Sequence, residues 1–267
     1  MIDLHCHILP GVDDGPATMA EAVAMCRTAS ADGIRTVVAT PHYRPGSFTW
    51  NPDEQQTAIE ALQNEIDAAG LLLTILPGAE IAFCPELPEL LKNGTHLTIN
   101  RGCYFLLEFR PEAVPANVEP FLSSMIEAGY LPIIAHPERN SWFTRRHDIL
   151  TSLVRRGALL QITAVSLLGE LGADVRSFSR LLLKNNLVQI IASDAHNPGD
   201  RPALLAAAVR AAADEIGTER ANALVTTNPQ AVINGIRLAA PEKAGYLATE
   251  ALPRTTSWFR RLLGTSS

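Results

Sequence analysis

The sequence predicts a single α/β domain in which seven parallel strands, joined by helices, form a barrel. The chain has 267 residues, of which 47% are hydrophobic and 19% charged, so it can bury one large core. Short runs rich in Val, Ile and Leu alternate with longer segments of helical period, which is the order typical of parallel strands with helical connections. No break in composition, internal repeat or low-complexity linker divides the chain, which favours one domain over two.

The elements follow one another in a regular order. Strands are expected at residues 2–7, 34–40, 72–80, 103–109, 131–136, 158–163 and 187–193. Helices are expected near residues 18–32, 52–69, 116–129, 147–156, 171–185, 203–216 and 218–225. Two of these helices carry start signals, because Thr18 to Glu21 and Asn51 to Glu54 have the spacing of a capping box, the second with Pro52 at the first helical position.

The alternating pattern ends near residue 236, so we expect a barrel domain at 1–236 and a peripheral tail at 237–267. The tail contains the segment 258–263, in which two arginines stand between apolar residues. An unstructured end is one interpretation of this segment. Docking to a second copy of the chain, to a partner kinase or to a membrane surface is the other, so a homo-oligomer stays open.

Charge and cysteine content exclude several classes of protein. The 22 Lys+Arg stand against 28 Asp+Glu, and this acidic balance argues against binding to nucleic acid or anionic lipid. The N-terminus has no basic and apolar leader, and no apolar run reaches the roughly 20 residues of a transmembrane helix, so we expect a cytoplasmic protein. The four cysteines form no C-x-x-C pair and are expected to be free thiols.

The first expected strand carries the motif His5-Cys6-His7. Side chains two residues apart in a strand face the same way, so both imidazoles can reach one metal ion or two adjacent ions. Asp3 lies on the same face and is expected to hold an imidazole N–H, while Cys6 faces the core. The loop Asp13-Asp14-Gly15 adds two carboxylates, and either one of them binds metal or the loop is only a turn.

Ligand-type residues also stand at the C-terminal ends of other expected strands. They are His42, Glu80, Glu108, His136, Asp194 and His196. In a parallel α/β barrel these ends open on one face, where active sites are built. Ionisable groups are costly to bury without a partner, so the set indicates a shared metal cluster, and imidazole and carboxylate ligands without thiolate suit Mn, Fe, Zn or Mg.

Taken in order, these segments resemble the PHP (polymerase and histidinol phosphatase) superfamily. The resemblance is carried by residues 1–7 (MIDLHCH), 13–16 (DDGP), 40–42 (TPH), 78–80 (GAE), 108–109 (EF), 136–139 (HPER) and 193–197 (SDAHN). More narrowly, they are similar to the manganese-dependent tyrosine phosphatases of bacterial capsule and exopolysaccharide loci. The resemblance covers residues 1 to about 236 and implies a distorted seven-stranded PHP barrel, with a three-metal centre at the C-terminal ends of the strands.

The resemblance also implies roles for individual residues. It places His5, His7, Glu80 and Asp194 on one metal ion, Glu80, Glu108 and His136 on a second, and Asp14, His42 and His196 on the third. Arg139 and Arg201 match the family's phosphate-binding arginines. The three divalent ions are expected to be Mn²⁺, and their charge of +6 exceeds that of the four carboxylates among the ligands, which leaves a pocket that attracts a phosphate dianion.

The implied reaction is hydrolysis of a phosphate monoester. The expected substrate is phosphotyrosine on the tyrosine-rich tail of a bacterial tyrosine autokinase that regulates capsular or exopolysaccharide synthesis. Another PHP phosphatase, acting on histidinol phosphate or a nucleotide, and an amidohydrolase-type metal hydrolase are the alternatives, since they share the metal set or the opening H-x-H. The acidic balance disfavours a nucleic-acid-binding PHP module, and so complete a ligand set disfavours a nonenzymatic scaffold.

Overall fold

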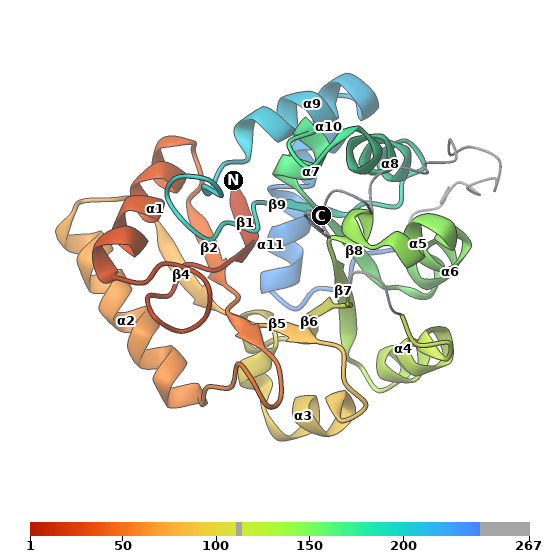
Figure 1. Cartoon of the computed structure of the whole chain (residues 1–267), viewed down its shortest axis with the longest axis horizontal. Helices are drawn as coiled ribbons and strands as arrows, with labels where there is room; N and C mark the ends of the chain where they lie inside the picture. The colour runs from red at the N-terminus through yellow and green to blue at the C-terminus, as the bar shows by residue number, and fades with distance from the viewer. Residues whose placement is uncertain (111–113, 241–267) are drawn as a thin grey trace, which may run out of the picture.

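The computed structural model describes residues 1–110 and 114–240. The segment 258–263 and most of the expected tail lie outside the described residues, so the predicted division at residue 236 stays a prediction. Strands form the centre of the molecule and helices surround them (Figure 1).

All the strands run parallel and fall into two hydrogen-bonded sheets, of order β1-β2-β4 and β3-β5-β6-β7-β8-β9. Their bounds are β1 (Ile2–Cys6), β2 (Thr36–Ala39), β3 (His42–Tyr43), β4 (Thr74–Pro77), β5 (Glu80–Ala82), β6 (Tyr104–Glu108), β7 (Leu131–Ala135), β8 (Leu159–Thr163) and β9 (Ile190–Ala192).

The two sheets make one ring of seven strand positions. Strand β2 continues into β3 after a two-residue break, and β4 continues into β5 in the same way. The ring closes beside β9, where Cys6 bridges Ala195 in parallel and the His7 N–H donates to the Ala195 carbonyl at 2.8 Å. The predicted parallel α/β barrel is therefore confirmed, and each of the seven expected strand ranges contains part of the ring.

The expected strand 72–80 is wrong in one respect, because it is broken. Gly78 and Ala79 separate β4 from β5, so Glu80 begins a strand in the second sheet instead of ending one in the first. A Cβ atom added to Gly78 would lie 2.7 Å from Cγ1 of Val38, which shows how closely the chain crosses its neighbour at the break. Only glycine fits this crossing.

Eight helices of the described residues lie between strands along the chain and three follow β9, and helices surround the ring (Figure 1). Their bounds are α1 (Met19–Ala31), α2 (Pro52–Ala68), α3 (Leu87–Asn93), α4 (Val118–Glu127), α5 (Ser141–Arg145), α6 (His147–Arg156), α7 (Ala164–Leu168), α8 (Ala173–Lys184), α9 (Ala206–Ile216), α10 (Thr218–Ala223) and α11 (Thr227–Ile233). Both expected capping boxes are confirmed. The side chains of Thr18 and Asn51 accept from the backbone N–H groups of Glu21 and Glu54, and the carboxylates of these glutamates accept from the backbone N–H groups of Thr18 and Asn51.

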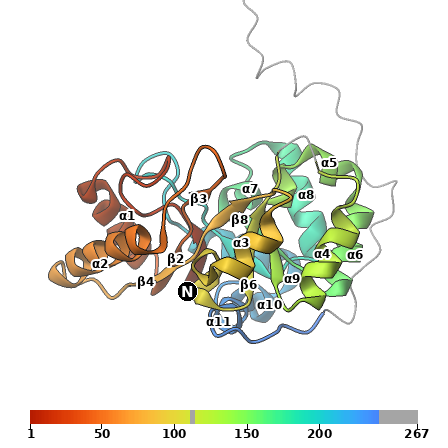
Figure 2. The same ribbon diagram turned by 90° about the horizontal axis from the view of Figure 1, so that it is seen from below.

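Four helices were not expected from the sequence: α3, α5, α7 and α11. They have five to seven residues, too few for a helical period to stand out. Helix α11 lies on the same side of the barrel as the N-terminus (Figure 2), where the N–H of Ile2 donates to the carbonyl of Val225. It packs against β1 on that side of the barrel.

Within residues 1–110 and 114–240, no helix combines the length and the apolar character needed to cross a membrane.

Candidate metal centre

The structure brings the nine predicted ligands together at the C-terminal ends of the strands. A cavity of about 200 Å³ is lined by seven of them, namely Asp14, His42, Glu80, Glu108, His136, Asp194 and His196. The other two, His5 and His7, are fully buried and contact the lining residues Glu80 and Asp194. Arg139 and Arg201 line the same cavity.

Strand pairing explains why residues distant in sequence meet here. His42 opens β3 and is paired in register with Glu80, which opens β5. Glu108 ends β6 and is paired with Ala82 of β5. His42 and Glu80 also come directly after the two-residue breaks that follow β2 and β4, so they lie at the C-terminal ends of those strands. Parallel strands carry such ends to the same end of the barrel.

Two predicted ligands follow their strands in a left-handed backbone conformation. His136, after β7, has φ of +32°, and Asp194, after β9, has φ of +53°. Such angles are uncommon for residues other than glycine and cost free energy on the order of 1 to 3 kcal/mol. At Asp194 the conformation is held by a hydrogen bond from its N–H to the His5 carbonyl at 2.8 Å.

Glu80 lies at the middle of the cluster. Its Oε1 is 2.8 Å from Nε2 of His136 and 3.4 Å from Nε2 of His5. Its Oε2 is 2.9 Å from Nδ1 of His42 and 3.4 Å from Nε2 of His7. One carboxylate therefore has four imidazoles around it, which suits a ligand shared between metal ions.

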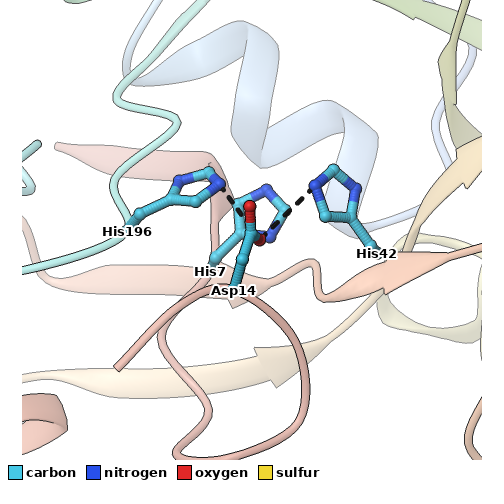
Figure 3. A group of neighbouring side chains, drawn as sticks. All are labelled: His7, Asp14, His42 and His196. Carbon is cyan, nitrogen blue, oxygen red and sulfur yellow. Dashed lines mark ion pairs between the residues drawn. The ribbon is translucent and has the colours of Figure 1, made fainter. Parts of the chain in front are cut away.

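The ligand atoms fall into four overlapping groups, each compact enough to hold a metal ion. Figure 3 shows one of them, in which Asp14 lies between His42 and His196, with His7 behind. The others are His5 with His7 and Glu80, His5 with His136 and Asp194, and His42 with Glu80 and Glu108. Relative to the sets implied by the resemblance, His7 joins the third set, and His42 lies beside Glu80 and Glu108.

The donor chemistry of the cluster fits divalent metal ions. Nε2 of His5 and Nε2 of His7 face each other at 3.2 Å, and Oδ1 of Asp194 lies 3.3 and 3.5 Å from them. Converging imidazole nitrogens and carboxylate oxygens, all buried, are costly unless a cation satisfies them. No thiolate belongs to these groups in the described part of the chain, and such ligand sets suit Mn, Fe, Zn or Mg.

The buried carboxylates of the cluster are held ionised by their neighbours. Burial opposes ionisation of Glu80, but the imidazoles of His5, His136 and His42 outweigh it and hold the pKa of that carboxyl well below its usual range. Burial likewise opposes ionisation of Asp194, whose pKa is held well below its usual range by its imidazole neighbours and by Arg139. Both carboxylates are therefore held in the anionic form that a metal ligand requires.

Arg139 and Arg201 meet on the outer oxygen of Asp194. Nη1 of Arg139 donates to Oδ2 of Asp194 at 2.6 Å, and Nη2 of Arg201 donates to the same atom at 2.8 Å. Nη2 of Arg201 also donates to the backbone carbonyl of Asp194 at 3.0 Å. Asp194 thus directs Oδ1 toward the imidazoles and Oδ2 toward the arginines, and both arginines belong to the cavity that contains the predicted ligands.

Asp3 does not play its expected role. Its carboxylate accepts hydrogen bonds from the N–H and Oγ of Ser193 and from the backbone N–H of His5, not from an imidazole. It therefore ties β1 to the segment that carries Asp194. The His5 ring does not contact Asp3 because its Nδ1 contacts Gln161 on another strand instead.

The hydrogen-bond partners of His5 and His7 were not predicted. Oε1 of Gln161 accepts from Nδ1 of His5 at 3.0 Å, and Oδ2 of Asp13 accepts from Nδ1 of His7 at 2.6 Å. Asp13 belongs to the loop in which the sequence left a ligand or a turn open, and there it contacts His7, one of the predicted ligands. Gln161 lies inside β8 and has no local sequence signal.

One further arginine lies at the rim of the site. Nη2 of Arg44, on the loop after β3, donates to Oε2 of Glu108 at 3.2 Å, and both side chains are partly exposed. Arg44 was not predicted, since it follows no motif and its partner is 64 residues away.

Comparison with known proteins identifies the family. Residues 1–234 match the model of the family described as capsular polysaccharide synthesis, CpsB/CapC. The chain is 40% identical to the tyrosine-protein phosphatase YwqE of Bacillus subtilis (strain 168) over 197 residues, which are 74% of this chain and 78% of that protein. It is 30% identical to the tyrosine-protein phosphatase CpsB of Streptococcus agalactiae serotype V over 238 residues, covering 87% of this chain and 98% of that protein.

Solved structures agree with this relationship. One comes from work on YwqE from Bacillus subtilis and CpsB from Streptococcus pneumoniae, described as unique metal-dependent tyrosine phosphatases; it matches with a TM-score of 0.86 and 33% identity, over 93% of this chain and 100% of that one. Histidinol phosphate phosphatase from Lactococcus lactis matches with a TM-score of 0.53 and 14% identity, over 85% of this chain and 93% of that one, which shows a shared fold. The chain belongs to the CpsB/CapC family, the metal-dependent tyrosine-protein phosphatases of capsular polysaccharide synthesis.

Proposed function

We propose that this chain uses three divalent metal ions, Mn²⁺ in the cell, to remove phosphate from the tyrosine-rich tail of a bacterial tyrosine kinase that regulates capsular or exopolysaccharide synthesis. The observation that carries the proposal is the single cavity in which seven of the predicted ligands meet both predicted phosphate-binding arginines. Family membership supports phosphotyrosine as the group that enters it.

The proposed ligands are the nine imidazoles and carboxylates of the centre, with Glu80 shared between ions. Bound there, divalent ions supply Lewis acidity toward the phosphate oxygens and the attacking water. His196 suits a ligand role, because burial and the neighbouring His7 lower its pKa to about 4. It is therefore a neutral imidazole at pH 7, with a lone pair for a metal ion and without the second ring proton that a general acid would donate.

In this proposal the two arginines bind and orient the phosphate. Asp194 holds one nitrogen of each guanidinium, so both positive charges stay beside the metal ligands. Preorganised cations of this kind stabilise the charge that develops on a transferring phosphoryl group. Departure of the tyrosine side chain needs little help from an acid, since a phenol has a pKa near 10 and its anion is a fairly good leaving group.

The mouth of the cavity suits a side chain presented by another protein. Asp14 is 54% exposed and Arg201 38% exposed, whereas Glu80 at the centre is 1% exposed. A phosphorylated side chain can therefore reach the buried ligand cluster from solvent by way of the exposed Asp14 and Arg201.

The test compares substrates and metal content on one preparation. Purified protein is titrated with Mn²⁺, its metal content per chain is measured, and hydrolysis of the phosphorylated kinase tail, a phosphotyrosine peptide, a phosphoserine peptide and histidinol phosphate is followed. We expect about three ions per chain and the highest kcat/KM on the phosphotyrosine substrates. Faster turnover of histidinol phosphate, or turnover that persists after chelation, would overturn the proposal.

A further inference from the structure

Strand β8 differs from the other positions of the barrel in what it contributes to the site. The expected strands at the other six positions each contain or precede a predicted ligand, whereas 158–163 does not. Yet β8 lies between β7 and β9, the strands that lead to His136 and Asp194. Its two polar residues, Gln161 and Thr163, are fully buried, and alternation along a strand places both on the same face.

Gln161 fixes the ring of His5. Its Oε1 is an acceptor, so Nδ1 of His5, at 3.0 Å, carries the proton and Nε2 carries the lone pair. That lone pair belongs to the atom that lies 3.2 Å from Nε2 of His7 and 3.3 Å from Oδ1 of Asp194. An amide fixes this tautomer without adding a charge, in contrast to the carboxylate of Asp13 on His7.

Stability does not explain a glutamine at this position. Nε2 of Gln161 is buried and has no hydrogen-bond partner among the described residues. A buried donor without a partner costs free energy, and the acceptor that the same amide offers to the buried Nδ1–H of His5 offsets that cost. The residue is therefore better explained by what its other atom does for His5.

Thr163 fixes the guanidinium of Arg139. Its Oγ1 accepts from Nη2 of Arg139 at 2.8 Å, donates to Oε1 of Glu138 at 3.1 Å and lies 2.6 Å from Oγ of Ser166. With its proton on Glu138, the hydroxyl has lone pairs left for Arg139 and Ser166. Since Nη1 of Arg139 is held by Asp194, the guanidinium is clamped between two fixed groups.

We propose that β8 positions both halves of the active site, Gln161 by orienting His5 for metal binding and Thr163 by orienting Arg139 for phosphate binding. The proposal rests on the metal and phosphate roles proposed above. It makes Gln161 and Thr163 positioning residues that touch neither the metal nor the phosphate. It predicts that a substitution at Gln161 lowers the affinity for metal and that a substitution at Thr163 lowers the affinity for phosphate, each without the other.

The test is a pair of substitutions with crossed readouts. Gln161→Leu is expected to lower the affinity for Zn²⁺, measured by calorimetry, by about 10- to 100-fold. At saturating Mn²⁺ its inhibition by inorganic phosphate should stay within a few-fold of wild type. Thr163→Val is expected to bind Zn²⁺ as wild type does and to raise the phosphate inhibition constant roughly 10-fold, the effect of one lost hydrogen bond.

Conservative variants serve as controls and protect the test against misfolding. Thr163→Ser keeps the hydroxyl and should bind phosphate within a few-fold of wild type. Gln161→Glu keeps the acceptor for Nδ1 of His5, and its negative charge should let it bind Zn²⁺ at least as tightly as wild type. Ser166→Ala removes a neighbour of Thr163 that does not touch Arg139 and should leave phosphate binding unchanged.

The proposal is overturned if Gln161→Leu keeps wild-type metal affinity, if Thr163→Val keeps wild-type phosphate affinity, or if each variant lowers both affinities alike. It is equally overturned if either conservative variant loses the affinity that it should keep. If wild-type protein binds neither metal nor phosphate, the proposed function fails instead, and that result is read from the wild type alone.

Discussion

Lysine substitutions at the two arginines of the cavity should have unequal effects. Arg139 uses two nitrogens on two acceptors, Nη1 on Asp194 at 2.6 Å and Nη2 on Thr163 at 2.8 Å. Arg201 uses a single nitrogen, Nη2, for both of its bonds to Asp194. A lysine has one nitrogen, so it can reproduce the pair made by Arg201 but only half of the pair made by Arg139.

The size of the difference follows from the bond that is lost. A neutral hydrogen bond contributes about 1 kcal/mol and one to a charged group about 1.5 to 3 kcal/mol, so Arg139→Lys should lower kcat/KM by roughly 5- to 150-fold. Arg201→Lys should stay within about threefold of wild type, because both of its bonds are kept. Initial rates on a phosphotyrosine peptide at saturating Mn²⁺ measure both variants, with bound metal and melting temperature as controls.

The reasoning is refuted if Arg201→Lys loses as much activity as Arg139→Lys while both variants retain their metal. Wild-type activity in Arg139→Lys would refute it equally, because the Thr163 contact would then have no part in holding the charge.

Three further outcomes follow from the geometry of the centre. Glu108→Gln, at a partly exposed ligand position, should lower kcat/KM by about 100-fold while the melting temperature stays within a few degrees, checked by phosphatase assay and thermal unfolding. Chelation should abolish activity and iodoacetamide should not, since Cys6 is fully buried, burial raises the pKa of Cys26 to about 12, and the partly exposed Cys84 and Cys103 do not line the cavity; thiol inactivation of the metal-loaded protein would contradict this. Burial alone would lower the pKa of His7, but hydrogen bonds to Asp13 and to the ligand carboxylates raise it well above its usual value, so metal must displace a proton and its affinity should rise with pH; calorimetry in buffers of different ionisation enthalpy detects that proton.

The members of the side-chain cluster could be predicted from the sequence because each has a local signal. His42 and His136 follow apolar strand-like runs, and the barrel brings the C-terminal ends of such runs together whatever their separation in sequence. The capping boxes at Thr18 and Asn51 are local in the same sense, since four consecutive residues contain the whole signal.

The supporting residues could not be predicted, because their partners are set by the closed barrel. Gln161 and His5 are 156 residues apart, and Asp3 and Ser193 are 190 apart. A glutamine inside an apolar strand has no period or motif that distinguishes an inward-facing polar group from an incidental one. The break at Gly78 was missed for a similar reason, since the close approach of Val38 that demands glycine comes from another strand.

Asp194 is the point at which the two halves of the site meet. Its Oδ1 faces the imidazoles, its Oδ2 accepts from both arginines, and its carbonyl accepts from Arg201 and from Nδ1 of His196 at 3.0 Å. Its left-handed backbone conformation is held by hydrogen bonds to His5 and Arg201, whose side chains its own carboxylate contacts. A metal ion bound at Oδ1 and a phosphate that competes with Oδ2 for the two arginines would both act on the same carboxylate. By thermodynamic linkage, if bound phosphate changes the affinity for metal by some factor, bound metal must change the affinity for phosphate by the same factor.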